Sequence, residues 1–119
     1  MNGWRQNSAM NNKYRIIYTE SAIRDMEEKV DYISLSLHDP GLAEKWYLRL
    51  RTEILKDLTR FPYKYPLYHV QKWSAKGIRQ FTFRNDVTLY SINEKEQIVY
   101  IWAVCTKGRD LTAHLEEHS

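Results

Sequence analysis

Hydrophobic and polar positions change their spacing along the chain, and each spacing predicts a different element. Residues 13–19 are rich in aromatic and β-branched side chains, which is typical of a strand. Over residues 23–37, apolar side chains recur at steps of three and four, so we expect an amphipathic helix. Asp39 followed by Pro40 is a typical helix start, and apolar positions at helical spacing over residues 43–61 predict a second helix.

The second half of the chain alternates with a period of two. Residues 78–83, 87–92 and 97–105 predict three strands, and the short turns between them predict an antiparallel meander. The short link between the two helices favours an antiparallel hairpin. The sheet and the hairpin each have one apolar face to bury, so we predict a two-layer α+β fold with an N-terminal strand, a helical hairpin and the meander. The expected contacts across the layers join Ile33, Leu50 and Ile54 to Leu89 and Ile101.

Length and composition indicate one globular domain. The chain has 119 residues, of which 43% are hydrophobic and 28% charged. Residues 1–12 are polar and aperiodic, so we expect a flexible tail before a single domain over residues 13–119, with a short closing helix at residues 110–118. No apolar run approaches the roughly 20 residues that a bilayer requires, and no signal peptide is recognised, so we expect a cytoplasmic protein without membrane contact.

Charge is distributed unevenly along the chain. The segment between Leu58 and Asn85 has no acidic residue and interleaves basic with aromatic side chains. Such a segment suits a phosphate backbone with unstacked bases or an acidic protein partner, and a merely solvated basic face remains the alternative. Trp73 is the aromatic residue of this segment that we assign to a binding surface, whereas Trp46 and Trp102 lie on apolar faces and are expected in the core.

Metal and cofactor chemistry has no support in the sequence. His38 and His69 flank turns and lack the spacing of metal ligands, so we predict neither a metal nor another cofactor.

Several short phrases follow one another along the chain. They are Ala22-Ile23-Arg24-Asp25-Met26, Asp31-Tyr32-Ile33, Asp39-Pro40, Phe61-Pro62, Gly77-Ile78-Arg79, Leu89-Tyr90-Ser91-Ile92 and Val104-Cys105-Thr106-Lys107-Gly108-Arg109-Asp110. In this order and spacing, they resemble the RelE/ParE toxins of type II toxin–antitoxin modules. The resemblance implies a growth inhibitor of a plasmid-stabilisation module, held in a complex by a cognate antitoxin whose disordered segment folds along the toxin. It also implies one of two targets: RelE-like members cleave mRNA in the ribosome, and ParE-like members poison DNA gyrase.

The RNA-cleaving branch is a metal-independent endoribonuclease that uses clustered cations and a terminal Tyr or His. Arg79 occupies a basic position of that pattern, but Phe81 and Val87 stand where a lysine and an arginine are expected. The nuclease hypothesis therefore rests on a partial catalytic set: Arg79, Lys107, Arg109 and His114. The alternatives to a catalytic role are a structural or antitoxin-binding role for Arg79 and a solvated side chain for His114.

The ParE branch is the closer resemblance. Residues 77–83, followed by Leu89-Tyr90, and the long helical hairpin look more like ParE than RelE. We therefore interpret the chain as a gyrase poison, with ribosome-dependent mRNA cleavage as the alternative. We expect an acidic amphipathic antitoxin segment to lie across the hairpin and the basic segment. The predicted target- or antitoxin-binding residues are Leu42, Tyr47, Lys72, Trp73, Lys76, Arg79 and Arg84.

Overall fold

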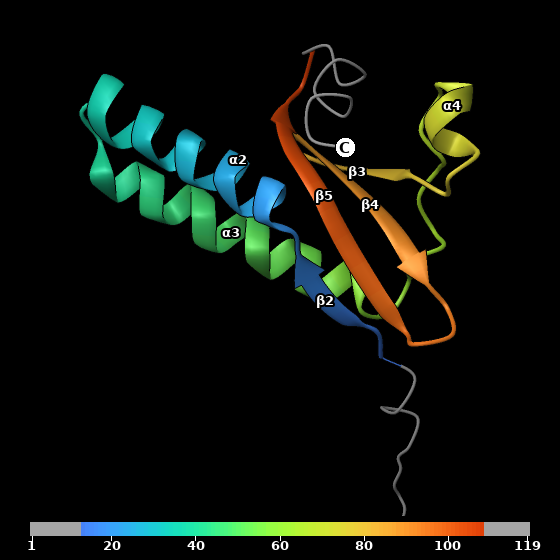
Figure 1. Cartoon of the computed structure of the whole chain (residues 1–119). Coiled ribbons are helices and arrows are strands. Elements are labelled where there is room, and N and C mark those ends of the chain that lie inside the picture. Colours follow the sequence, from blue (N-terminus) through green and yellow to red (C-terminus); the bar gives the residue numbers. More distant parts are fainter. Residues whose placement is uncertain (1–12, 109–119) are drawn as a thin grey trace, which may run out of the picture.

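The computed structural model describes residues 13–108 (Figure 1). Its elements are β2 (Arg15–Tyr18), α2 (Glu20–Asp31), the π-helical turn η1 (Tyr32–Ser36), α3 (Pro40–Leu58), α4 (Gln71–Ser74), β3 (Arg79–Phe83), β4 (Asp86–Asn93) and β5 (Ile98–Thr106). The predicted strand, helical hairpin and meander are confirmed. The short helix α4 and the turn η1 were not predicted. The expected tail at residues 1–12 and the expected closing helix at residues 110–118 lie outside the described residues.

The four strands form one sheet in the order β2-β5-β4-β3. The last three strands are the predicted antiparallel meander, and β2 joins its far edge parallel to β5, with Arg15 beside Ile98. Figure 1 shows α2 and α3 side by side, projecting away from the sheet. This arrangement leaves much of the hairpin surface exposed beyond the sheet.

The helical hairpin follows local sequence signals. Thr19 caps α2, because its hydroxyl accepts a hydrogen bond from the Ala22 amide. Asp39 caps α3 in the same way by accepting from the Leu42 amide, and Pro40 fills the first helical position. The predicted apolar stripe of the first helix is buried only in its middle, since its ends, Ile23 and Leu37, are exposed.

The main core lies between the hairpin and the sheet. Its buried residues are Ala22, Met26, Leu50, Ile54, Leu58, Phe81, Tyr90, Val99, Ile101 and Val104. Leu50, Ile54 and Ile101 share this core as expected, whereas Ile33 is buried outside it, in the lining of a groove beside α3. Leu89, however, was assigned to the wrong face: it is fully buried, but in a second cluster beneath α4.

A β-bulge explains this error. Tyr90 pairs with Ile101 and Leu89 with Ala103, so Trp102 has no partner on β4. The extra residue reverses the alternation of β5, so that Ile101 faces the hairpin and Ala103 faces away. Trp102 itself is 38% exposed, which corrects its prediction as a core residue.

The opposite face of the sheet is partly covered by the segment that leads into β3. Tyr68, Trp73 and Ile78 from this segment pack on Leu89 and other sheet residues. A bridge between Leu67 and Arg79 holds the segment against the edge of the sheet. The aperiodic basic segment is therefore a structured cover of the sheet and not an open loop.

Candidate functional site

A groove between α3 and the β3–β4 turn brings together two residues that the sequence placed on a binding surface. Leu42, from the first turn of α3, and Arg84, from the turn, both line this groove of about 160 Å³. The complete lining is Ile33, Leu42, Trp46, Arg49, Leu50, Phe83, Arg84 and Asp86. We call it the Leu42–Arg84 groove.

The groove combines apolar walls with positive charge. Leu42 is 44% exposed, although an apolar side chain gains free energy from burial. Arg84 has a left-handed backbone, φ 56°, and its guanidinium lies over the Phe83 ring at 5.4 Å from the centroid. Arg49 adds a second guanidinium to the lining. Such a surface suits an apolar side chain flanked by carboxylates.

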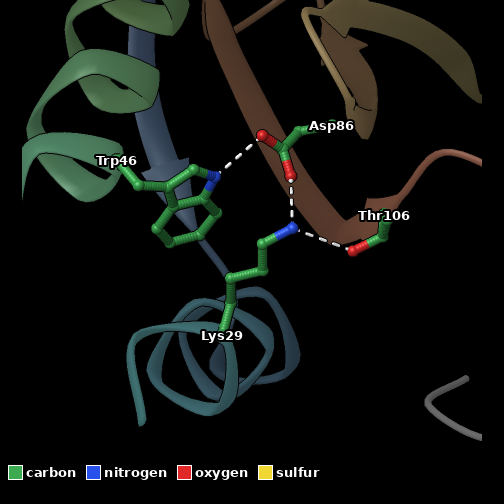
Figure 2. Close-up of polar contacts among 4 residues, drawn as sticks. All are labelled: Lys29, Trp46, Asp86 and Thr106. Atoms are coloured by element: carbon green, nitrogen blue, oxygen red, sulfur yellow. Dashed lines mark hydrogen bonds and ion pairs between the residues drawn. The ribbon is translucent and has the colours of Figure 1, made fainter. Parts of the chain in front are cut away.

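The deep side of the groove is a buried polar cluster (Figure 2). Asp86 is 5% exposed, and both of its carboxylate oxygens are occupied. Oδ2 accepts a hydrogen bond of 2.7 Å from Trp46 Nε1, and Oδ1 forms an ion pair of 3.1 Å with Lys29 Nζ. The same ammonium group donates to Thr106 Oγ1 at 2.9 Å.

This cluster connects four elements: α2, α3, β4 and β5. A buried carboxylate is costly unless it is paired and hydrogen-bonded, so the contacts of Asp86 hold α3 against the start of β4. They also set the width of the Leu42–Arg84 groove, because Asp86 and Trp46 line it. Sequence reasoning missed Asp86 and Lys29, since each fits an ordinary turn or helix surface and no local pattern pairs positions so far apart.

The other predicted binding residues lie elsewhere. Tyr47 is half-buried on another side of α3, where it lines two further grooves. Lys72, Trp73 and Lys76 belong to the cover on the opposite face of the sheet. The predicted binding residues therefore lie on two faces of the sheet, and an antitoxin segment across both the hairpin and the basic segment stays a prediction.

Trp73 needs a further correction. Its ring is 4% exposed and forms part of the second core cluster. Lys72 and Lys76 place their ammonium groups at 5.1 and 4.9 Å from the ring centroid, so they cover the indole by cation–π contact. The two lysines, and not the tryptophan, form the accessible surface here.

Arg79 makes structural contacts. Its Nη1 donates to the backbone carbonyl of Tyr65 at 2.6 Å, and its guanidinium stacks on the Tyr63 ring at 5.2 Å. These contacts join the start of β3 to the segment after α3, as the structural alternative for Arg79 had suggested. Phe81 and Val87 are both buried, in the clusters on opposite faces of the sheet.

Lys107 lies far from Arg79. Arg79 pairs with Tyr90, whereas the Lys107 amide donates to the carbonyl of Asn85 at 2.8 Å. Asn85 and Tyr90 are five positions apart, which corresponds to about 17 Å along an extended strand. Arg79 and Lys107 therefore stand at well-separated positions along the sheet. Arg109 and His114 lie outside the described residues.

A cluster of tyrosines surrounds Glu94 in the β4–β5 turn. Tyr14 and Tyr63 both donate to Glu94 Oε1, at 2.6 and 2.8 Å. These hydrogen bonds lower the pKa of Glu94, and the bond to the carboxylate raises the pKa of Tyr14 to about 12. The cluster ties the beginning of the domain to the turn beside Arg79, and the sequence gave no sign of it.

Residues 13–108 offer neither a metal-binding cluster nor a membrane-spanning helix. No three His, Cys, Asp or Glu side chains gather there in a way that suits a metal ion. No helix in this part of the chain is long and apolar enough to cross a membrane.

Comparison with known proteins decides the family. The family model of the ParE toxin of type II toxin–antitoxin systems, parDE, matches residues 16–111. The chain belongs to the ParE toxin family. No curated protein sequence matches it.

Two solved structures share the fold of this ParE-family chain. One is the chromosomal ParDE system from P. aeruginosa, with a TM-score of 0.64 at 16% identity over 81% of this chain and 98% of that chain. The other is the RelBE2 toxin–antitoxin complex from Mycobacterium tuberculosis, with a TM-score of 0.61 at 17% identity over 82% and 94%. At these identities the likeness establishes the fold alone.

Proposed function

We propose that this ParE-family toxin inhibits growth by poisoning DNA gyrase and is neutralised by a cognate antitoxin. The register of the sheet supports this choice of target, because it places Arg79 and Lys107 well apart along the strands. Cleavage of RNA by its own 2′-hydroxyl requires several cations around one phosphate, because charge develops there in the transition state.

The contacts of Arg79 add to this argument. The Arg79 guanidinium donates to the Tyr65 carbonyl and stacks on the Tyr63 ring. These contacts leave it little freedom to move towards a reacting phosphate. The two positions where the nuclease pattern has further cations hold the buried side chains Phe81 and Val87. These features favour a toxin that acts by binding a protein target.

For the antitoxin, we propose the Leu42–Arg84 groove as the docking site of an acidic segment. The segment would bury an apolar side chain against Leu42 and Phe83 and place carboxylates beside Arg49 and Arg84. The Asp86 cluster supports this role, since it keeps the groove formed before the partner arrives.

The gyrase proposal is tested with purified components. We expect the toxin, added to gyrase, ATP and supercoiled plasmid, to trap a covalent cleavage complex that appears as linear DNA after detergent and protease treatment. A parallel primer extension on an abundant transcript, after induction in cells, should show intact mRNA. Codon-phased cuts that disappear in the Arg79→Ala or His114→Ala variant would instead establish the ribosome-dependent nuclease.

The antitoxin proposal is tested on the same chain. Arg84→Glu and Arg49→Glu should each weaken binding of the antitoxin encoded beside the toxin by about tenfold or more, because each places a carboxylate against the acidic segment. Arg24→Glu is the matched control, since Arg24 is exposed on α2 and does not line the groove. Equal weakening by all three variants would mean that net charge, and not this groove, determines binding.

A further inference from the structure

A second surface of the hairpin carries an acidic, a basic and two apolar residues in one stripe along α3. Along α3, the exposed residues Glu44, Leu48, Arg51 and Leu55 follow one another at steps of four, three and four. This spacing places them in one stripe on the helix. Leu48 and Leu55 are 55% and 59% exposed, and their spacing of seven residues places both apolar side chains on the same stripe.

Two grooves lie along this stripe and share Tyr47. The first, of about 340 Å³, lies between α2 and α3 and has an apolar floor that includes Val30 and Ala43. Its rim is acidic: Glu27, Asp31 and Glu44 line it and are exposed. Among residues 13–108, none of these three carboxylates has an ion pair or a hydrogen-bonding side chain. The first groove therefore suits an apolar side chain accompanied by a cation.

The second groove, of about 330 Å³, lies between α3 and β2 and has the opposite charge. Arg51 lines it together with Leu48 and Leu55. The Arg51 guanidinium lies 5.1 Å from the Tyr18 ring centroid and 5.4 Å from that of Tyr47, and it donates to the Tyr47 hydroxyl at 2.7 Å. The two rings hold the cation in place, and it has no carboxylate partner within residues 13–108.

We propose that this face binds a second copy of the chain, with the two α3 helices antiparallel about a two-fold axis that passes between Tyr47 and Leu48. Positions at equal distances from the axis then meet: Arg51 of each copy faces Glu44 of the other, and Leu55 faces Pro40 at the floor of the acidic groove. A two-fold interface must be self-complementary, and this stripe supplies an acid, a base and apolar residues in mirrored positions.

The contact would be dominated by the apolar residues, with the charges fixing its register. Each copy contributes Leu48 and Leu55 as projecting side chains, and each receives them beside Tyr47 and Ala43. The Arg51–Glu44 pair occurs twice, so that a shift of the helices along each other would leave both pairs broken. The inference does not depend on the proposed toxin target. It also concerns a different side of α3 from the Leu42–Arg84 groove, whose lining includes none of the four stripe residues.

The test is a charge exchange, read by sedimentation velocity and light scattering on the purified full chain. We expect the wild-type chain to dimerise in the range from about 1 µM to about 100 µM. Arg51→Glu and Glu44→Arg should each raise the dissociation constant by about 100-fold, because each variant creates two like-charge contacts per dimer. Mixing the two single variants should restore a dimer, since every contact in the mixed pair is then between opposite charges.

Two further variants keep the experiment decisive. Lys45→Glu changes an exposed charge of α3 that lines neither groove, so the dimer should persist. Leu48→Asp should abolish the dimer while the circular dichroism spectrum and melting temperature remain those of the folded chain, because Leu48 is exposed in the monomer. A wild-type chain that is monomeric up to about 100 µM would overturn the proposal. So would a dimer that the charge variants leave unchanged.

Discussion

The two faces of the sheet are covered in different ways, although both are apolar. The hairpin face is a broad layer whose buried residues come from two helices and three strands, and it includes the ion pair of Lys29 with Asp86. The other face is covered only in part, by Trp73 and its neighbours beneath the short helix α4. One face depends on two regular helices, and the other depends mainly on the buried aromatic side chains of Tyr68 and Trp73.

This difference has consequences for function. The hairpin face keeps its polar contacts internal, so the Leu42–Arg84 groove sits on a fixed base. The α4 cover buries its aromatic residue and exposes lysines. A basic and aromatic sequence segment therefore does not by itself indicate an aromatic binding surface, because the ring can be the core of the local structure.

The largest expected effect is the loss of the aromatic anchor. Trp73→Ala should lower the free energy of unfolding by about 4 kcal/mol, because it removes the largest side chain of a small cluster. Hydrogen exchange should show faster exchange of the amides over residues 68–78, with the hairpin amides less affected. As a control, Lys76→Ala removes only one cation from the ring and should cost about 0.5–1 kcal/mol. Uniform loss of protection in both regions would show that the two faces are not independent.

A smaller effect is expected on the hairpin face. Leu50→Ala should cost about 3 kcal/mol in urea unfolding, since Leu50 is 1% exposed at the centre of the main core. Leu35, which is 69% exposed, provides the control: its replacement by alanine should change stability by no more than about 0.5 kcal/mol. Similar values for the two leucines would contradict the described layer arrangement.

The ion pair should contribute less than the apolar core. Asp86→Asn keeps an acceptor for Trp46 but removes the negative charge beside Lys29, and we expect a loss of about 2 kcal/mol. Lys29 is partly exposed, which limits the effect. Combining Asp86→Asn with Lys29→Met should cost less than the sum of the two single changes, as measured by a double-mutant cycle. Strict additivity would mean that the two side chains do not interact in solution.

The smallest expected effect is stabilising. Thr88 is fully buried, and its hydroxyl has no hydrogen-bond partner among the described residues. Thr88→Val keeps the shape and removes the unpaired polar atom, so the free energy of unfolding should rise by about 1 kcal/mol. Thermal denaturation of the wild-type chain and of Thr88→Val under the same conditions measures this difference in stability. A destabilised variant would show that the hydroxyl is bonded in solution.

The helices and strands of this fold can be predicted from sequence patterns. Which layer each side chain faces can be predicted only in part. Helical spacing and the Asp39-Pro40 start predict the hairpin, and the period of two predicts the meander. That Leu89 and Ile101 face opposite layers was not predictable, because a single bulge residue at Trp102 shifts the alternation of β5 and leaves no mark in the pattern.

The candidate site was predictable to a smaller degree. Leu42 and Arg84 were both predicted as binding residues, one on the hairpin and the other in the basic segment, without any sign that they are neighbours. Their shared groove depends on Asp86, which contacts Lys29 and Trp46 across large gaps in sequence. Such contacts arise from the packed tertiary structure, and no local pattern of residue types encodes them.

The parallel pairing of β2 with β5 has a consequence for the order in which the chain can fold. Arg15 and Ile98 are neighbours in space but 83 positions apart in the chain, so the first strand remains without its partner until the last strand has been synthesised. The two helices of the hairpin contact each other over short sequence distances and are expected to form early, whereas their packing on the sheet and the closure of the sheet come late. A nascent chain on the ribosome therefore carries the hairpin surface before it carries a complete sheet.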